Sequence, residues 1–366
     1  MSELLTYQVA LTLLPGIGAI KAKNLVSYCG SVEAVFKQKK SSLLKIPEIG
    51  PVLAEGIIKQ NVFAQAEQEV KFIKRHKIQP LFYLDDNYPH RLKQCNDAPV
   101  LLYYKGNAPL NTQRVLAIVG TRKATEYGRS VCAEIIEGLS DKSILIVSGL
   151  AYGIDINAHR DALKNGYNTV GVVGHGLDRI YPGSHTATAR KMSEQGGILT
   201  EFISGTDPSP ENFPARNRIV AGMSDATLVI EAAEGGGALI TAEIANSYNR
   251  DVFAIPGRTK DEFSRGCNNL IRMNKAALIQ SAEDLQSFMS WDVVSAQADN
   301  VQQKLWNDLS DEEQEILQVL SSGDTLPIDV ISIRSGLSAS KTGSVLLNLE
   351  FKGLIKAQPG KMFRLI

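Results

Sequence analysis

The sequence predicts an α/β protein built on a doubly wound, mostly parallel sheet. Twice, a short run of β-branched apolar residues breaks at a loop of small residues, and each loop opens a helical pattern. Val115–Val119 leads into Gly120-Thr121-Arg122, and residues 144–147 lead into Ser148-Gly149-Leu150. The same alternation repeats to about residue 286. A right-handed series of such crossovers forms a doubly wound sheet.

The elements of this central region follow one another in regular order. The strands are expected at 115–119, 144–147, 169–173, 198–202, 226–231, 251–255 and 277–280. The intervening helices are expected near 126–139, 155–165, 184–195, 214–223, 238–249 and 266–275. In a parallel sheet the strand-to-helix loops all lie at the carboxyl edge, where ligands bind. The loops expected there are 120–122, 148–150, 174–176, 204–218, 234–237 and 256–258.

Length and charge limit the possible partners. The 366 residues are enough for two or three domains, and a hydrophobic content of 44% supports full cores. Lys and Arg together number 39, as do Asp and Glu. Because there is no global positive field, a nucleic acid would have to be bound by local basic clusters.

The cysteines and the start of the chain indicate a reduced, cytoplasmic protein. Cys29, Cys95, Cys132 and Cys267 lie far apart, with no CxxC or Cys/His cluster. This pattern indicates neither a disulfide framework nor a zinc site. The first residues lack a basic region followed by an apolar core, and no run approaches the roughly 20 apolar residues that span a bilayer. We expect no metal, cofactor or membrane segment.

Residues 1–75 predict a small helical domain with two similar halves. Segments 13–26 and 43–58 each contain an apolar pair, a proline, a turn ending in glycine and a helix. The first resembles a helix-hairpin-helix of the SAM-like kind, whose Gly16-Ile17-Gly18 turn can offer N–H groups to a phosphate. The alternative is a structural bundle that uses a convenient turn, and the residues leave both open.

The remaining parts flank the sheet domain, which we place at residues 76–286. Residues 76–110 are expected to supply an edge strand and a lead-in, and 287–308 lack periodicity and predict a linker. Residues 309–366 predict a winged helix, with helices at 311–320, 328–337 and 338–353 and a hairpin at 354–366. Its third helix offers only Lys341 and Lys352, and the tail is net acidic. Because phosphate neutralisation drives nucleic-acid affinity, we expect a protein-contact or regulatory role here.

Glycine spacing argues against a nicotinamide dinucleotide site. Such a site needs G-x-G-x-x-G between a strand and a helix. Residues 120–128 have glycines only at their ends, and residues 148–153 have a glycine where the fingerprint has x. An oxidoreductase is therefore not expected.

Arg122 is the most informative residue of the first loop. A guanidinium in this turn places a bidentate phosphate binder beside backbone N–H donors. The alternative is a structural salt bridge to a carboxylate at the sheet edge.

A second basic cluster follows Phe213. The proline after it suits the first turn of a helix, and Arg216 and Arg218 then oppose the helix dipole unless an anion binds there. Phe213 is placed to stack on a base, as in single-strand binders. The alternatives are that Phe213 belongs to the core, or that the arginines are solvated or pair with Glu231 or Glu201.

A third glycine loop, Glu234-Gly235-Gly236-Gly237, permits a ligand to approach the backbone closely; otherwise it is a flexible turn. Arg258 extends the basic character of this edge. His159 and His175 belong to no nucleophile–base set, so no catalytic residue is assigned.

Several motifs together resemble the DNA-processing protein DprA (Smf) family. They are IVGTR…TEYG (118–128), SGLAYGID…AH…AL (148–163), YPGSH (181–185), FPARNRIVAG (213–222), ALITAE (238–243) and DVFAIPG (251–257). The resemblance implies an extended Rossmann-like core that binds single-stranded DNA, acts as a homodimer and has no established catalysis. It also implies protection of incoming strands in natural transformation and loading of the recombinase RecA.

The resemblance and the loop analysis together define the candidate DNA-binding residues. They are Gly120, Thr121, Arg122, Ser148, Gly149, Phe213, Arg216, Asn217, Arg218, Gly236, Gly237 and Arg258. By the resemblance, the strand is contacted by Arg122, Phe213, Arg216, Asn217 and Arg218. The Ser148-Gly149 and Gly235–Gly237 turns would hold phosphates. The family's usual Ser-Gly-Ser is Gly236-Gly237-Ala238 here, so hydroxyl donors are lost.

Two other functions remain as hypotheses. A nucleotide-processing enzyme of the LOG-like phosphoribohydrolase type has a loop similar to 234–238, and Glu243 would be its acid. The missing threonine in that loop and the FPxRNR motif count against it. The third hypothesis is a scaffold that works through its tail, residues 309–366.

Overall fold

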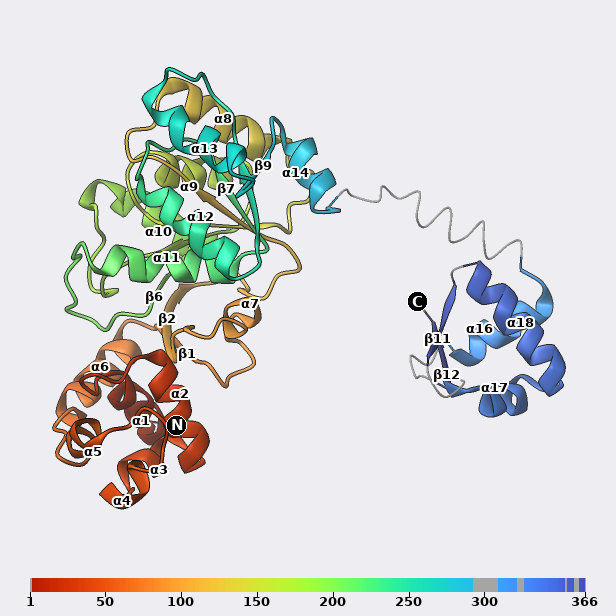
Figure 1. Cartoon of the computed structure of the whole chain (residues 1–366), viewed down its shortest axis with the longest axis horizontal. Helices are drawn as coiled ribbons and strands as arrows, with labels where there is room; N and C mark the ends of the chain where they lie inside the picture. Colours follow the sequence, from red (N-terminus) through yellow and green to blue (C-terminus); the bar gives the residue numbers. More distant parts are fainter. Residues whose placement is uncertain (1, 292–308, 321–325, 353, 359–361, 366) are drawn as a thin grey trace. The chain divides into compact units, whose positions relative to one another are not determined.

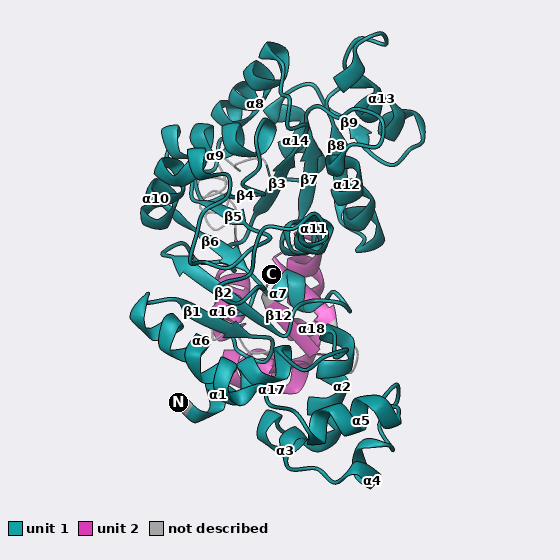
Figure 2. Ribbon diagram, turned by 90° about the vertical axis from the view of Figure 1, so that its left-hand side faces the viewer, with its two compact units in different colours: residues 1–292 teal, residues 293–366 magenta. Residues whose placement is uncertain are grey.

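The computed structural model describes residues 2–291, 309–320, 326–352, 354–358 and 362–365 (Figure 1). The chain divides into two compact units, Met1–Asp292 and Val293–Ile366 (Figure 2). Most of the predicted linker, residues 292–308, lies outside the described residues.

The first unit contains a nine-stranded sheet in the order β1-β2-β6-β5-β4-β3-β7-β8-β9. The strands are β1 (Gln79–Phe82), β2 (Leu101–Gly106), β3 (Val115–Val119), β4 (Leu145–Ser148), β5 (Thr169–Val172), β6 (Gly196–Thr200), β7 (Ala226–Val229), β8 (Asp251–Ala254) and β9 (Ala277–Leu278). Strands β3 to β9 run parallel, and β1 and β2 extend the sheet antiparallel at β6. The predicted doubly wound, mostly parallel sheet is therefore confirmed.

Helices cover both faces of this sheet. They are α7 (His90–Lys93), α8 (Glu126–Gly138), α9 (Ile154–Lys164), α10 (Thr186–Glu194), α11 (Asn212–Met223), α12 (Gly237–Ser247), α13 (Arg265–Arg272) and α14 (Ala282–Phe288), with 3-10 turns at Gly183–His185 and Glu262–Ser264. Helices α7, α11, α12 and α13 share a buried core with one face of the central strands, and α8, α9 and α14 share a core with the other. In β3, Ala117 and Val119 point to the first core and Leu116 and Ile118 to the second.

Several predicted boundaries differ from those of the structure by one to three residues. The strand expected at 198–202 occupies Gly196–Thr200, and it ends there because the Thr200 hydroxyl accepts a hydrogen bond from the Phe202 N–H at 3.1 Å. Residues 287–291 of the predicted linker pack on the sheet domain instead. Trp291 is buried, and its carbonyl oxygen accepts a hydrogen bond from Arg114 Nη1 at 2.9 Å.

The N-terminal residues form a helical bundle against the edge of the sheet (Figure 1). Its helices are α1 (Ser2–Thr12), α2 (Ala19–Cys29), α3 (Val32–Phe36), α4 (Lys40–Leu43), α5 (Pro51–Ile58) and α6 (Phe63–Arg75). Their apolar side chains form one continuous core with Phe82, Leu101 and Tyr103 of β1 and β2. Full burial of one large apolar side chain typically stabilises a fold by about 2–3 kcal/mol. The side chains of these two strands therefore stabilise the bundle directly.

The second unit is a winged helix, as predicted. Helices α16 (Asp311–Leu320), α17 (Ile328–Ser335) and α18 (Ala339–Phe351) enclose an apolar core. A three-stranded antiparallel sheet joins them, formed by β10 (Leu326–Pro327), β12 (Met362–Leu365) and β11 (Ile355–Gln358).

Candidate nucleic-acid interface

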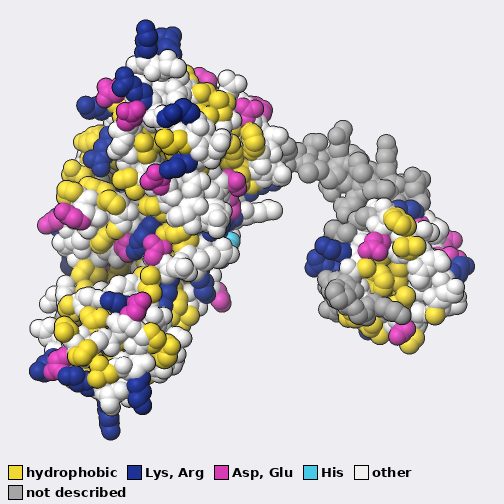
Figure 3. Space-filling model, in the orientation of Figure 1, with side chains coloured by type: hydrophobic (Ala, Val, Ile, Leu, Met, Phe, Trp, Pro, Cys, Tyr) yellow, Lys and Arg dark blue, Asp and Glu magenta, His cyan; other side chains and the backbone are white. Residues whose placement is uncertain are grey.

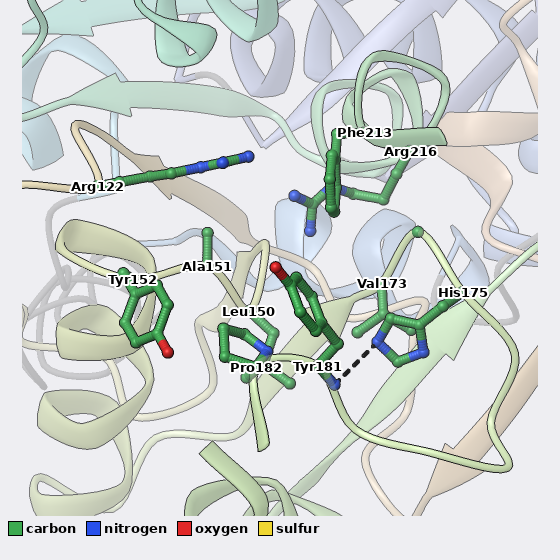
Figure 4. Close-up of a pocket in the computed structure, with 11 residues that line it drawn as sticks. Arg122, Leu150, Ala151, Tyr152, Val173, His175, Tyr181, Pro182, Phe213 and Arg216 are labelled. Atoms are coloured by element: carbon green, nitrogen blue, oxygen red, sulfur yellow. Dashed lines mark hydrogen bonds between the residues drawn. The ribbon is translucent and has the colours of Figure 1, made fainter. Parts of the chain in front are cut away.

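The strand-to-helix loops meet at the carboxyl edge of the sheet, and there they line a hollow that is open to solvent. The loops after β3, β4 and β5 supply three of its walls, and the first turn of α11 supplies the fourth. The lining residues are Arg122, Leu150, Ala151, Tyr152, Val173, Gly174, His175, Tyr181, Pro182, Phe213 and Arg216 (Figure 4).

A cation and two aromatic rings form the outer wall of the hollow. The Arg122 guanidinium lies 5.2 Å from the centroid of the Phe213 ring, a cation–π distance. The Tyr181 ring also stacks with the Phe213 ring, with centroids 6.5 Å apart and planes 28° from parallel. Figure 4 shows Arg122 extended from its loop toward Phe213. The structure therefore brings together two predicted residues that are about ninety positions apart in the chain.

Arg122 remains available to a ligand. Its side chain is exposed, and no carboxylate among the described residues pairs with it. The alternative of a structural salt bridge is thereby excluded for this part of the chain. Tyr152 and Tyr181 are also half exposed, at 51% and 49%. The wall thus offers one free positive charge and open aromatic surface, the two features that single-strand binders combine.

Arg216 lies at the base of the hollow and is only 6% exposed. Its Nη1 donates a hydrogen bond to the Val172 carbonyl oxygen, and its Nε donates to Asn217 Oδ1 at 3.1 Å. Asp155 supplies the opposing charge: burial raises the pKa of this carboxyl, and the positive charge of Arg216 acts against that rise. Arg216 and Asn217 thus have protein partners already.

The loop residues expected to cradle phosphates are also engaged within the protein. The Ser148 hydroxyl is fully buried and donates to the Ile118 carbonyl oxygen at 2.6 Å. The Thr121 N–H donates to the Glu231 carbonyl oxygen at 2.7 Å. Gly149 is buried against Asp155 and Arg216. These residues shape the loops that present Arg122, and direct strand contact at these positions stays a prediction.

Gly120 also shapes the loop that presents Arg122. A Cβ there would overlap Ile154 at the start of α9, so the glycine allows β3 and α9 to approach each other. Glu231 does not pair with an arginine. Its carboxylate accepts hydrogen bonds from the N–H and hydroxyl of Thr125, the residue that caps α8.

Arg218 faces away from the hollow. Its Nη2 pairs with Glu201, and its Nη1 donates to the Asp97 carbonyl oxygen. Both charged side chains are mostly buried, 16% and 17% exposed. The alternative of pairing with Glu201 is confirmed, and contact of Arg218 with DNA stays a prediction. The direction of Arg218 follows from helical geometry, because positions two residues apart lie on opposite sides of a helix.

The third glycine loop and Arg258 lie outside the hollow. Gly236 caps α12, Gly237 begins that helix, and neither lines the hollow with the β3–β5 loops. A side chain at Gly237 would meet nothing within 4 Å. Arg258 is exposed on the loop after β8. Their contact with a strand stays a prediction, at a separate place on the same edge.

Three buried histidines form hydrogen bonds with the backbone of the loops that line the hollow. Nothing in the sequence pattern predicted this role. His159 Nε2 donates to the Gly149 carbonyl oxygen at 2.6 Å, and His185 Nδ1 lies 2.9 Å from the Leu150 carbonyl oxygen. His175 Nδ1 donates to the Gly176 carbonyl oxygen, while its Nε2 accepts from the Tyr181 N–H at 3.2 Å. Burial lowers the pKa of both His159 and His175, which keeps them neutral. The wall loops are therefore held in place before any ligand arrives.

The N-terminal turn that resembles a phosphate site lies beside the sheet domain. Ile17 is buried, whereas Gly16 and Gly18 are exposed, and Gly18 lines a cavity together with Arg218 and Glu201. Lys23 donates to the Asn96 carbonyl oxygen at 3.2 Å. Contact of this hairpin with a phosphate stays a prediction, beside the structural alternative.

Charge elsewhere on the surface is dispersed. On the face of the first unit drawn in Figure 3, Lys and Arg form separate small clusters interspersed with Asp and Glu. Within the described residues no helix is both long and apolar enough to cross a membrane. In the same residues no three His, Cys, Asp or Glu side chains are grouped as metal ligands.

Comparison with known proteins adds family matches along most of the chain. Residues 79–290 match the model of DNA recombination-mediator protein A, residues 304–361 match the DprA winged helix domain, and residues 9–60 match a SAM-like helix-hairpin-helix tandem. Protein Smf of Synechocystis is 31% identical over 98% of both chains.

Two solved structures are similar over most of the first unit. The X-ray structure of DNA processing protein A from Streptococcus pneumoniae is 34% identical, covers 77% of this chain and 97% of its own, and has a TM-score of 0.68. DNA processing protein A from Helicobacter pylori, studied for its single-stranded DNA binding mode, is 28% identical. It covers 59% of this chain and 97% of its own, with a TM-score of 0.54.

Proposed function

The chain belongs to the DNA recombination-mediator protein A (DprA/Smf) family, and from that premise we propose that it binds single-stranded DNA in the hollow at the carboxyl edge of its sheet. In this proposal it serves natural transformation in the cytoplasm: as a homodimer it protects incoming strands and helps a RecA-type recombinase to load. The Helicobacter pylori relative, whose single-stranded DNA binding mode has been studied, supports the choice of ligand.

One observation carries the proposal: the free guanidinium of Arg122 lies over the Phe213 ring, with Tyr181 beside it. An unpaired cation at a solvent-open hollow attracts a phosphate, and the adjacent rings offer stacking surface to a base. Stacking is tolerant of sequence because every base has a π face. We expect binding that is salt-dependent and weakly selective for sequence.

The histidines of the walls support a binding role rather than catalysis. Both ring nitrogens of His159 and of His175 are occupied by protein partners, so neither ring is free to exchange a proton with a ligand. Burial also keeps both of them neutral.

The alternative nucleotide-processing enzyme is not favoured. Glu243, its expected acid, is 61% exposed on α12 and pairs with Lys275 at 3.1 Å. It does not line the hollow where the strand-to-helix loops meet.

Fluorescence anisotropy of labelled oligo-dT, titrated at several salt concentrations, tests the proposal. Arg122→Ala should weaken binding and reduce the salt slope by about 0.7, the value for one phosphate contact on a single strand. Phe213→Ala should cost about 1–3 kcal/mol of affinity and leave the slope unchanged, because it removes stacking and no charge. Arg75→Ala, which removes an exposed arginine from α6, is the matched control. If both wall variants bind as tightly as the parent, the hollow is not the site.

The recombinase step has its own test. The parent chain should shorten the lag of RecA filament formation on strands coated with single-strand binding protein, and Arg122→Ala should lose that effect in proportion to its lost affinity. If Arg122→Ala shortens the lag as much as the parent does, recombinase loading does not require strand binding at the hollow. Sedimentation velocity reports whether the full chain is dimeric.

A further inference from the structure

We propose that the bound strand leaves the hollow across the Tyr181–Pro182 turn and continues in a second groove beside α10. This α10 groove is lined by Lys105, Leu177, Ile180, Ala189, Arg190 and Ile198. It would hold the sugar-phosphate backbone of the following nucleotides. The inference rests on the proposed function and extends its binding track.

The groove has a defined construction. Lys105 on β2 lies directly opposite Ile198 on β6 in the antiparallel register, so both side chains project from the same face of the sheet. Helix α10 lies beside these strands, and Ala189 and Arg190 project from its second turn into the groove. The groove is open to solvent, so an extended backbone can enter without rearrangement of the fold.

The hollow and the α10 groove share one wall and one floor. Leu177 and Ile180 line the groove, and the next residues of the same segment, Tyr181 and Pro182, line the hollow. A single apolar cluster lies beneath both: Leu150 and Val173 belong to the hollow, while Leu177, Ile180, Ala189 and Ile198 belong to the groove. The two depressions are therefore neighbours on one continuous base.

The free charge of the groove fits a polyanion. Lys105 and Arg190 are exposed, and no carboxylate among the described residues pairs with either. The one carboxylate in the lining, Asp178, is occupied by Arg179 at 2.9 Å and by the Gly205 N–H at 2.8 Å. Arg179 also pairs with Asp207. Two positive charges are thus left unbalanced.

The groove contains no aromatic side chain, in contrast to the hollow. It has cations for phosphates and aliphatic side chains for sugars, but no surface on which a base can stack. We infer a division of labour, in which bases stack at Tyr181 and Phe213 and only the backbone is held beyond the turn.

The test compares Lys105→Ala/Arg190→Ala with the parent on two oligonucleotides, dT4 and dT15, at several salt concentrations. We expect dT4 to bind at the hollow, where the stacking surface lies, whereas dT15 has further nucleotides that can reach the groove. On dT15 the salt slope should fall by about 1.4, so between 50 and 200 mM salt the parent loses about sevenfold more affinity than the variant. On dT4 the two proteins should bind alike.

Lys71→Ala/Lys93→Ala is the matched control, because it removes two exposed lysines from α6 and α7, which do not line the groove. Equal losses in the control and the groove variant, or equal losses on dT4 and dT15, would overturn the inference. If the double variant matches the parent on dT15 while Arg122→Ala is weak on both strands, the hollow stands and the groove does not. If the parent binds neither strand, the proposed function itself fails.

Discussion

Gly149 shows how closely side chains pack beneath the candidate site. A Cβ at this position would overlap the Asp155 carboxylate and lie 2.6 Å from Arg216 Nη1. Its carbonyl oxygen is also held by His159. One residue without a side chain thus lets a buried acid, a buried base and a buried histidine meet below the hollow.

Gly149→Ala should therefore lower the free energy of unfolding by about 1–3 kcal/mol, the usual cost of an added methyl group in a packed interior. Gly237→Ala is the matched control, since a Cβ there meets nothing and the residue begins a helix. We expect that control to be neutral or to stabilise by up to about 1 kcal/mol. Urea unfolding measures both, and equal stabilities of the two variants would contradict the packing argument.

His159 should make stability depend on pH. Burial lowers its pKa from 6.5 to about 4, so between these values the unfolded chain binds a proton that the folded chain does not. Stability attributed to this group is therefore complete above pH 6.5 and is lost as the pH falls toward 4, at up to about 1.4 kcal/mol per pH unit. Urea unfolding from pH 7.5 to 4.5 should show a shallower fall for His159→Gln than for the parent.

Two buried acids act in the opposite direction. Burial raises the pKa of Asp155 and of Glu201, so the folded chain takes up protons there before the unfolded chain does. Only the difference between parent and variant isolates His159. A pH profile of His159→Gln similar to the parent's would show that the imidazole is not held neutral.

At the scale of elements, α11 serves two surfaces at once. Phe213 and Arg216 in its first turns face the hollow, whereas Arg218 points to the loops beside the N-terminal bundle. The buried Glu201 carboxylate relies on Arg218 for its hydrogen bond and its opposing charge. Among the described residues Glu201 Oε1 has no hydrogen-bond partner, and burial raises the pKa of Glu201. Arginine in this helix is therefore a binding group at one position and a structural group at another.

Arg218→Ala should consequently reduce stability by about 3–5 kcal/mol, since it leaves a buried carboxylate without its partner. The affinity of the folded variant for short oligo-dT should stay near that of the parent. Adding Glu201→Gln should restore part of the stability by removing the stranded charge. Chemical unfolding and anisotropy together decide the matter: a large loss of affinity in a stable Arg218→Ala protein would return this residue to the binding site.

The order of elements was predictable because parallel strands buried on both faces read as short apolar runs, and β3 lies where Val115–Val119 predicted it. The loop cluster followed from the topology, since parallel strands share one carboxyl edge. What the pattern could not supply was the direction of each side chain. Arg216 and Arg218 are the same residue type in one short motif. They reach different surfaces because residues two positions apart project from different sides of a helix.

Tyr181 and the histidine ties were missed for a related reason. A buried histidine leaves no periodic signal, because its partners are backbone carbonyls contributed by other loops. Tyr181 belongs to the YPGSH motif, but the spacing of that motif does not predict that the Tyr181 ring stacks on Phe213. Its place in YPGSH, a few residues after the loop at 174–176, is the signal in the sequence that could have placed it at this wall.

For the whole molecule, the second unit should be dispensable for strand binding. The two lysines that sequence analysis singled out on its third helix are both engaged by acids of α16: Lys341 with Glu312, and Lys352 with Glu313 at 2.7 Å. A chain ending at residue 292 should therefore bind oligo-dT with the affinity and salt slope of the full chain and lose interactions with protein partners. Lys341→Ala/Lys352→Ala in the full chain is the companion variant. A reduced salt slope in either protein would assign a phosphate contact to the winged helix.

The core shared by the N-terminal bundle and the sheet has a consequence for synthesis on the ribosome. The bundle is made first, but its apolar interior is closed by Leu101 and Tyr103 of β2, and β2 in turn pairs with β6 through Tyr103 and Thr200. Since chains emerge from the amino end, the first-made helices must wait for more than a hundred further residues before their last neighbours arrive. Contacts so distant in sequence are slow to form. The nascent chain therefore passes through a stage with exposed apolar helices, when chaperones have most to protect.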